Sequence, residues 1–219
     1  MSTTTARLPM LARFALVAAL TSVVTLLAVS FVDARGLVPR PNEVRFNLPP
    51  AEDAPNPFLA GGVAFGQNTA LYFSSGIGPG ALNTDAPAGT PERYIDPAQF
   101  PGGELPDGVT ITEAQGMNNM QRIVENLDSQ GLTVHDITSM RIYLEAPPGA
   151  DRADYAGWNR AYRKYMANVD RTTGEVLEQF EPVVIPNVVR PSRTNLEVAT
   201  LPVQGWLVEI EVVAAYPQR

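Results

Sequence analysis

Two segments with helical periodicity limit the fold of this chain more than any other feature. Between residues 110 and 130, apolar side chains recur at spacings of three and four, Thr112 and Gln115 can form a capping box, and Gly131 suits the C-terminal end. Those apolar residues are Met117, Met120, Val124 and Leu127. Residues 151–166 repeat the pattern with four aromatic side chains, which are Tyr155, Trp158, Tyr162 and Tyr165. Two helices are too few to cover both faces of a sheet, so a doubly wound fold is disfavoured.

The remaining periodic segments have the patterns of strands. Residues 137–144 alternate between apolar and polar side chains, as a half-buried strand does. Residues 59–65 and 70–74 outline one hairpin, and residues 193–200 and 206–215 outline a second. The order β-β-α-β-α-β-β indicates an α+β layer fold.

An uncharged run from residue 14 to residue 32 follows a short stretch that contains Arg7 and Arg13. Such a segment is an export signal, or a membrane anchor if it is retained, since it is just long enough to span a bilayer as a helix. Small residues before Arg35 favour cleavage there. We therefore expect residues 1–34 to direct the chain to the periplasm or the medium, or to anchor it facing the periplasm. Contact with a membrane is expected only if the segment is retained.

Proline-rich composition marks the irregular parts of the chain. Residues 35–57 contain six prolines and few periodic apolar positions, which predicts an extended linker. Folded structure is expected from Phe58, giving a domain over residues 58–219. Two long loops interrupt this domain, at residues 79–109 and at about residues 168–189.

Composition excludes several classes of function. The net charge is -7, so the chain lacks the basic surface that nucleic-acid binding usually needs. There is no cysteine and a single histidine, His135, which argues against thiolate catalysis, a metal site and a Ser-His-Asp triad. Any catalysis must therefore use carboxylates, arginine and backbone groups, without a metal or cofactor.

Two carboxylates in the last apolar run are the first candidates for a site. Glu209 and Glu211 share one face of that strand, and this face is either a solvated outer surface or part of a site. Pro191 favours an extended backbone before Arg193, and we expect the Arg193 strand to be the hairpin partner of the Glu209 strand. The arginine is then either half of a structural ion pair or a bidentate anchor for a substrate carboxylate.

Several motifs resemble the RidA/YjgF family of imine and enamine deaminases in order and approximate spacing, over roughly residues 57–216. They are Ser75-Gly76, Asn126-Leu127 with Gly131-Leu132, Asp154-Tyr155 with Asn159 and Tyr162, Pro191-Ser192-Arg193 with Glu197-Val198 and Leu201-Pro202, and Val208-Glu209-Ile210-Glu211. The C-terminal motifs are the most specific of these.

This resemblance implies a six-stranded antiparallel or mixed sheet with two helices on one face, of the chorismate mutase-like type. It also implies a homotrimer with active sites between subunits, and hydrolysis of 2-imino and enamino acids to 2-keto acids and ammonia. Arg193 would bind the substrate carboxylate and Glu209 would activate the attacking water. Phe58 and the backbone at Gly76 and Asn195 would complete the substrate site.

Three functions remain open at this point. The first is an exported deaminase, and the second is a non-catalytic trimer that binds small carboxylated metabolites outside the cytoplasm. Phe58 stands where many active members have tyrosine, and Ile77 where glutamine is common, so the substrate range stays open. The third, a ribonuclease activity sometimes attached to the family, is the least favoured because the chain is acidic.

Overall fold

The computed structural model of this chain describes residues 38–217. The predicted signal or anchor, residues 1–34, lies outside this range. Within the described range, no helix is both long enough and apolar enough to cross a membrane. Residues from Pro41 onward belong to one compact unit, and this unit holds every candidate site residue.

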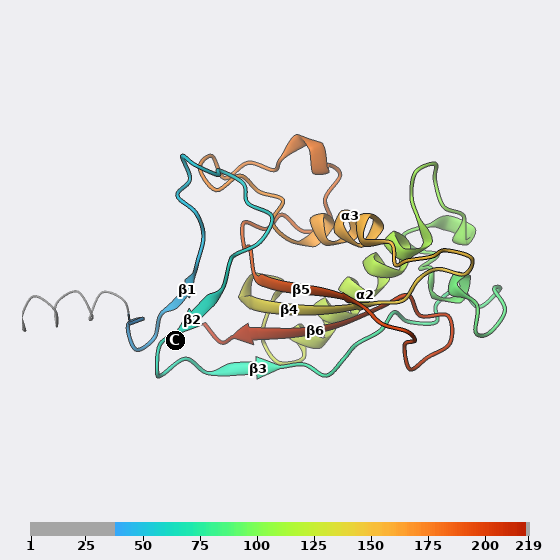
Figure 1. Ribbon diagram of the computed structural model, residues 1–219, viewed down its shortest axis with the longest axis horizontal. Helices are drawn as coiled ribbons and strands as arrows, with labels where there is room; N and C mark the ends of the chain where they lie inside the picture. The colour runs from blue at the N-terminus through green and yellow to red at the C-terminus, as the bar shows by residue number, and fades with distance from the viewer. Residues whose placement is uncertain (1–37, 218–219) are drawn as a thin grey trace, which may run out of the picture. The chain divides into compact units, whose positions relative to one another are not determined.

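Both predicted helices are present, as α2 (Ile111–Asp128) and α3 (Tyr155–Tyr165) (Figure 1). The predicted capping box is wrong, because the N-cap of α2 is Thr110, whose side chain accepts a hydrogen bond from the Glu113 N–H at 3.2 Å. Thr112, the predicted cap, is buried inside the helix. The buried polar residues of the first turn face protein rather than water, which the apolar periodicity alone does not reveal.

The strands form two sheets, and the α+β class is confirmed. They are β1 (Val44–Phe46), β2 (Val63–Phe65), β3 (Leu71–Phe73), β4 (Ile137–Leu144), β5 (Ser192–Glu197) and β6 (Val208–Ala215). Strands β1 and β2 make a two-stranded antiparallel sheet. The other four run in the order β3-β6-β4-β5, with β4 antiparallel to β6 and parallel to β5. The six expected strands are thus divided between two sheets, one antiparallel and one mixed.

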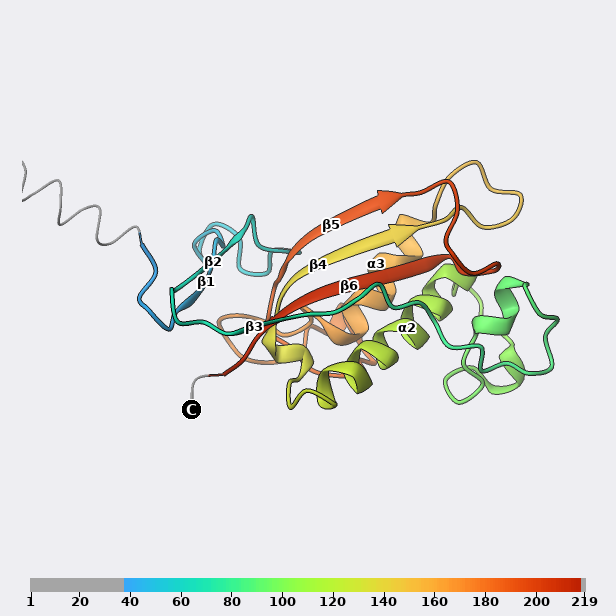
Figure 2. The same cartoon turned by 90° about the horizontal axis from the view of Figure 1, so that it is seen from below.

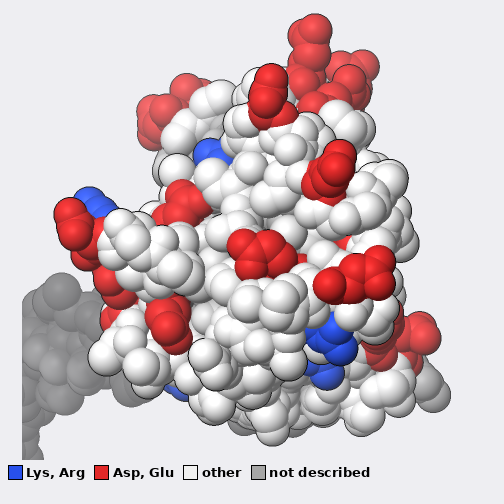
Figure 3. Space-filling model, turned by 90° about the vertical axis from the view of Figure 1, so that its right-hand side faces the viewer, with Lys and Arg blue, Asp and Glu red and all other residues white. Residues whose placement is uncertain are grey.

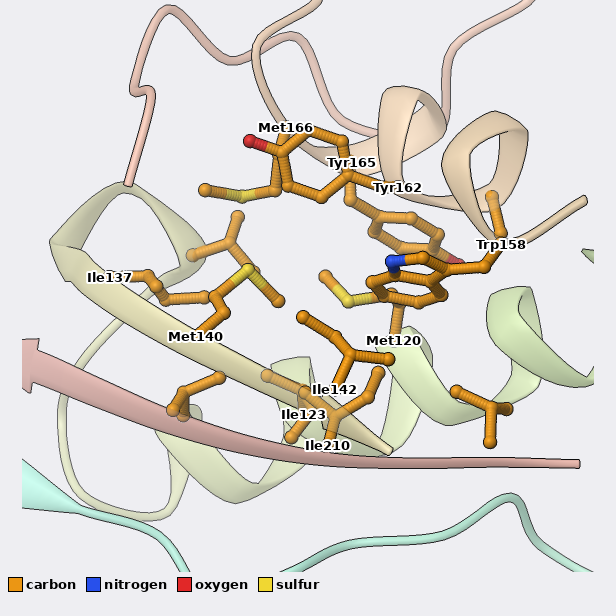
Figure 4. Close-up of a cluster of buried hydrophobic side chains, with 14 of the residues drawn as sticks. Met120, Ile123, Ile137, Met140, Ile142, Trp158, Tyr162, Tyr165, Met166 and Ile210 are labelled. Carbon is orange, nitrogen blue, oxygen red and sulfur yellow. The ribbon is translucent and has the colours of Figure 1, made fainter. Parts of the chain in front are cut away.

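The main core lies between one face of the four-stranded sheet and the two helices. Figure 2 shows α2 and α3 on the same side of β4, β5 and β6. The alternating side chains of β4 and β6 meet the aromatic side chains of α3 and the methionine and isoleucine side chains of α2, and nearly all are fully buried (Figure 4). The opposite face of this sheet is not covered by any helix of the described residues.

Neither predicted hairpin is present. Strand β2 pairs with β1 and β3 pairs with β6, so the two N-terminal strands are not partners. Strand β4 lies between β5 and β6, which separates the two C-terminal strands. The physical reason is the long connection after β4, which contains α3 and allows β5 to return parallel to β4 as a crossover. The ten residues 198–207 then carry the chain past β4 to β6.

The predicted linker, residues 35–57, is folded from about Pro41. The Gly66 N–H donates to the Glu43 carbonyl at 2.8 Å, and the Asn68 N–H donates to the Pro41 carbonyl at 2.7 Å. Further along, the Arg171 guanidinium donates to the carbonyls of Pro49 and Ala54. Prolines are tolerated here because the segment lies at a sheet edge and in turns, where their missing N–H groups have no ladder to fill.

The long loop of residues 79–109 is packed against α2. Ile95 and Phe100 are buried in a small second core beside the start of the helix. The buried Asn118 side chain donates to the carbonyls of Gly80 and Tyr94, each at 2.8 Å. Backbone groups of an irregular segment must find partners when they are buried, and polar side chains of α2 supply them.

Candidate functional site

Arg193 lies on the edge strand β5 with its side chain on the helix-covered side of the sheet. It stands opposite Met140, which is buried in the core, and paired residues of neighbouring strands share a face. Its guanidinium carbon is 4.4 Å from the ring centre of Phe58 and 4.5 Å from that of Tyr162. Nη2 donates to Asn159 Oδ1 at 2.9 Å, whereas the buried Nη1 has no partner among residues 38–217. The arginine is held rigidly and still has donors to offer.

The charge of Arg193 is not neutralised within the described residues. No carboxylate of residues 38–217 lies within 4.0 Å of its guanidinium nitrogens. Burial lowers the pKa of Arg193 to about 10, and the neighbouring Tyr162 opposes that change. The side chain therefore stays a cation at neutral pH. A partly buried cation without a counter-ion favours an anionic ligand.

Asn195 and Phe58 lie beside Arg193, and the three residues are called the arginine half-site below. Asn195 follows Arg193 by two positions and stands opposite Ile142, so it shares the same face, and its buried Oδ1 has no partner among the described residues. Phe58 is fixed by Tyr162, whose hydroxyl donates to the Phe58 carbonyl at 3.3 Å. Three of the five predicted site residues are thus brought together.

Glu209 and Gly76 form a second cluster, the carboxylate half-site. Glu209 lies on β6 opposite Tyr143, on the face of the sheet that the helices leave uncovered. A Cβ atom placed on Gly76 would lie 1.9 Å from Glu209 Oε1, so the carboxylate rests against the glycine backbone, where a side chain would collide with it. The two residues were predicted for one site, and the fold places them in contact.

The Glu209 carboxylate is unpaired, in contrast to its neighbour. Glu211 accepts a hydrogen bond from the Tyr143 hydroxyl at 3.3 Å and forms an ion pair with Arg141 at 3.5 Å. Glu209 has no hydrogen bond or ion pair with residues 38–217. Burial and then the charge of Glu211 raise the pKa of Glu209. An unpaired carboxylate with a raised pKa has the properties of a general base.

The two half-sites of one chain are far apart, so the expectation that Arg193 and Glu209 lie close together as hairpin partners is wrong. Strand β4 separates them, with Met140 opposite Arg193 and Tyr143 opposite Glu209. Two strand spacings and three residue rises give a Cα separation of roughly 14 Å. The side chains also point to opposite faces of the sheet. One small ligand cannot touch both groups of the same chain.

Three residues near Arg193 were not predicted as part of the site. Asn159 orients the guanidinium, Tyr162 stacks on it, and Arg163 contacts the other predicted residue, Phe58, with its guanidinium carbon 4.3 Å from the ring centre. The aromatic stripe of α3 was interpreted as core, which is right for Tyr162 as well, because it is fully buried. Asn159, a polar residue at helical spacing from that stripe, was the sequence signal that could have indicated these site residues.

The described residues contain no candidate metal site. Within residues 38–217, no group of three or more histidine and carboxylate side chains is arranged to hold a metal ion. His135 lies in the short helix η3 (Val134–Asp136) and is exposed.

These observations define an α+β protein with two helices on one face of a mixed sheet, an arginine half-site on that side and a carboxylate half-site on the other. The family model described as "Endoribonuclease L-PSP" matches residues 101–216, more than half of the chain. The chain belongs to this family, the YjgF/RidA family, and the predicted resemblance is confirmed.

Several solved structures are similar to this chain at low identity. A YjgF family member from Neisseria meningitidis is 18% identical, with a TM-score of 0.39, and covers 82% of this chain and 100% of its own. A Rid family protein of unknown function, YyfB from Yersinia pestis, is 16% identical, with a TM-score of 0.43, and covers 79% of this chain and 98% of its own. TdcF from E. coli, solved with bound serine, is 20% identical, with a TM-score of 0.38, and covers 68% of this chain and 82% of its own. A comparison with curated proteins gives no match.

Proposed function

We propose that this protein hydrolyses reactive 2-imino and enamino acids to 2-keto acids and ammonia. The observation that carries the proposal is that one chain presents both a partly buried arginine with free donors and an unpaired carboxylate of raised pKa. The substrate class has one carboxylate and one electrophilic carbon. An arginine and a base are the two groups that its hydrolysis needs.

The proposed reaction uses only residues of this protein and water. Arg193 binds the substrate carboxylate through its free donors, and Phe58 and Asn159 keep the guanidinium in place. Glu209 accepts a proton from water as the water oxygen bonds to the imine carbon, and it returns that proton to the imine nitrogen, which becomes an amine. The hydroxyl proton of the resulting carbinolamine then passes through Glu209 to this amine, the C–N bond breaks, and ammonia leaves as the carbonyl forms. One water is consumed for each ammonia released, and no electron transfer occurs.

The site requires a second copy of the chain, and we propose a homotrimer. The half-sites of one chain are roughly 14 Å apart on opposite faces of the sheet, which no small imino acid spans. The uncovered face carries two apolar side chains of unusual exposure, Phe73 at 67% and Leu196 at 49%. Packing of the β5 edge of one chain, which carries Arg193, against that face of the next would cover them and would bring Arg193 toward the neighbour's Glu209. Multi-angle light scattering on residues 35–219 tests the assembly, and a stable monomer at micromolar concentration would remove the shared site.

Ammonia release is the direct test of the reaction. The 35–219 fragment would be added to 2-iminopropanoate or 2-iminobutanoate generated in the cuvette by an amino acid oxidase. We expect faster loss of the imine and faster ammonia release than in buffer, with no effect of a chelator. Release at the buffer rate with a correctly folded protein would reject the deaminase.

A non-catalytic binding trimer is the second candidate, and Phe58 is the observation that favours it. Its ring carries no hydroxyl beside Arg193, so one polar group that could hold water or substrate is absent from the arginine half-site. Carboxylate binding without turnover, with binding lost in Arg193→Lys, would support this candidate. A ribonuclease is not proposed, because the chain has a net charge of -7 and more acidic than basic groups lie on the face shown in Figure 3.

We also propose that the protein acts outside the cytoplasm. The support is the uncharged run of residues 14–32 behind Arg7 and Arg13. The substrate is then an imino acid that forms in, or reaches, the periplasm or the medium.

A further inference from the structure

A hollow of about 330 Å³ lies beside the arginine half-site, between α3 and the segment that contains helix η4 (Glu178–Phe180). This segment is the orange loop above α3 in Figure 1. The residues that line it include Phe58, Asn159, Arg163, Lys164, Gln179 and Phe180. Arg193 does not line the hollow, because the Phe58 ring stands between Arg193 and the hollow. This ring contacts the guanidiniums of both Arg163 and Arg193.

Arg163 is the feature that points to a ligand. The side chain is only 8% exposed, and its Nε has no partner among residues 38–217. Its guanidinium carbon lies 4.3 Å from the ring centre of Phe58 and 4.5 Å from that of Phe180, and Nη1 donates to the Ala167 carbonyl. No carboxylate of the described chain lies within 4.0 Å of it.

Arg190 shows how this fold treats an arginine with a purely structural role. It is 1% exposed, and its nitrogens donate to the carbonyls of Pro57, Val188 and Val169 and to Asn56 Oδ1. Every nitrogen of that guanidinium has a partner. Arg163 is almost as buried but keeps an unpaired nitrogen, a difference that general packing does not account for.

The other charges of the hollow leave it positive. Arg160 and Glu113 neutralise each other with a nitrogen-oxygen distance of 2.7 Å. Lys164 donates to the carbonyls of Phe180 and Pro182 at 3.3 and 2.9 Å and has no acidic partner in the described residues. Two cations thus remain between aromatic walls, in a chain whose net charge is -7.

We propose that this hollow is a second binding site, separate from the catalytic one, for a small organic carboxylate with an aromatic or branched apolar body. The carboxylate would pair with Arg163 and Lys164, and the apolar body would lie against Phe58 and Phe180. One ligand would then provide a partner for the unpaired nitrogen of Arg163 and cover the partly buried rings of Phe58 and Phe180. Because Phe58 also stacks on Arg193, a ligand here presses on the residue that positions the substrate anchor.

Gln179→Glu tests the site without disturbing the fold, because Gln179 is exposed and lines the hollow. The probe is benzoate, measured by calorimetry on the 35–219 fragment, with neutral benzamide as the comparison. We expect benzoate to bind more tightly than benzamide, and Gln179→Glu to weaken benzoate binding about five- to tenfold through like-charge repulsion. The matched control is Gln130→Glu, an exposed glutamine just after α2 that is not among the lining residues.

A second variant tests the arginine itself. Arg163→Lys keeps the charge and the reach to Ala167 but loses the planar donor pair, so benzoate should bind at least threefold more weakly while the melting temperature stays close to the parent value. Equal benzoate affinity in Gln179→Glu and Gln130→Glu, or no preference for benzoate over benzamide, would overturn the site. These are binding readouts, so they do not depend on whether the protein turns over imino acids.

Discussion

The contact between Gly76 and Glu209 makes Gly76→Ala the most informative single substitution. A Cβ at this position would lie 1.9 Å from Glu209 Oε1 and 2.9 Å from its Cδ, far inside van der Waals contact. The φ angle of Gly76 is not positive, so alanine causes no backbone strain. The colliding atoms are the end of a flexible side chain, and the carboxylate can swing away. We therefore expect the free energy of unfolding to change by less than about 1 kcal/mol.

The same displacement removes the proposed base from its position. General base catalysis contributes about 10²- to 10⁴-fold, and a displaced carboxylate keeps part of that, so kcat should fall roughly 10- to 100-fold with little change in KM. The assay is ammonia release from 2-iminobutanoate, with thermal unfolding measured in parallel. Gly62→Ala is the matched control, since its Cβ would meet no atom within 4 Å. Full activity in Gly76→Ala together with an inactive Glu209→Gln would refute the reasoning.

Three further predictions follow from the site and the sequence. Arg193→Lys should lower kcat/KM for imino acids roughly ten- to a hundredfold with the fold intact, because one of the two charge-assisted hydrogen bonds to the carboxylate is lost. Circular dichroism and kinetics on the same sample check this. Activity should fall on the acid side as the pH drops through the raised pKa of Glu209, and on the basic side as the pH rises through about 10 and Arg193 loses its proton; a pH profile of kcat/KM that stays flat across either limit would contradict the assignment. A fusion of residues 1–40 to an export-dependent reporter should be active, and activity confined to the cytoplasm would reject the localisation.

Ionisation of Glu209 should lower the stability of the folded protein, whereas ionisation of a carboxyl group in an ion pair usually raises it. The pKa of Glu209 is raised in the folded state, so the folded protein binds this proton more tightly than the unfolded chain does. Its carboxylate form therefore lowers stability at neutral pH, and this loss is relieved as the pH falls through the raised pKa. Glu209→Gln should raise the melting temperature slightly, by an amount that corresponds to less than about 1 kcal/mol because the group is partly exposed.

Local patterns predicted the elements of this fold better than their pairing. Both helices, and strand β4 with Met140, Ile142 and Leu144 inward, follow from periodicity because one face of each packs on a single core. The partners of β5 could not be read in the same way. Its side chains are all half-buried or exposed at the sheet edge, and the crossover that places it beside β4 is a property of the whole chain.

The sequence named candidate residues for the site but did not predict their geometry. The family resemblance named Arg193, Phe58 and Asn195, and also Glu209 and Gly76. Their division between two faces depends on β4 lying between the strands, which no local pattern encodes. Arg163 was missed because a basic residue in the last turn of a helix usually lies in solvent, whereas this one is covered by Phe58 and Phe180.

Co-expression of Arg193→Lys with Glu209→Gln tests the central claim, a site built from two copies of the chain. Each variant alone should be nearly inactive. In randomly mixed trimers, an interface that takes Arg193 from one subunit and Glu209 from its neighbour has both parent residues in about one case in four, so ammonia release should recover to roughly a quarter of the parent rate. Two distinguishable affinity tags on the variants would confirm that mixed assemblies form. Mixed assemblies that remain as inactive as the single variants would contradict the account.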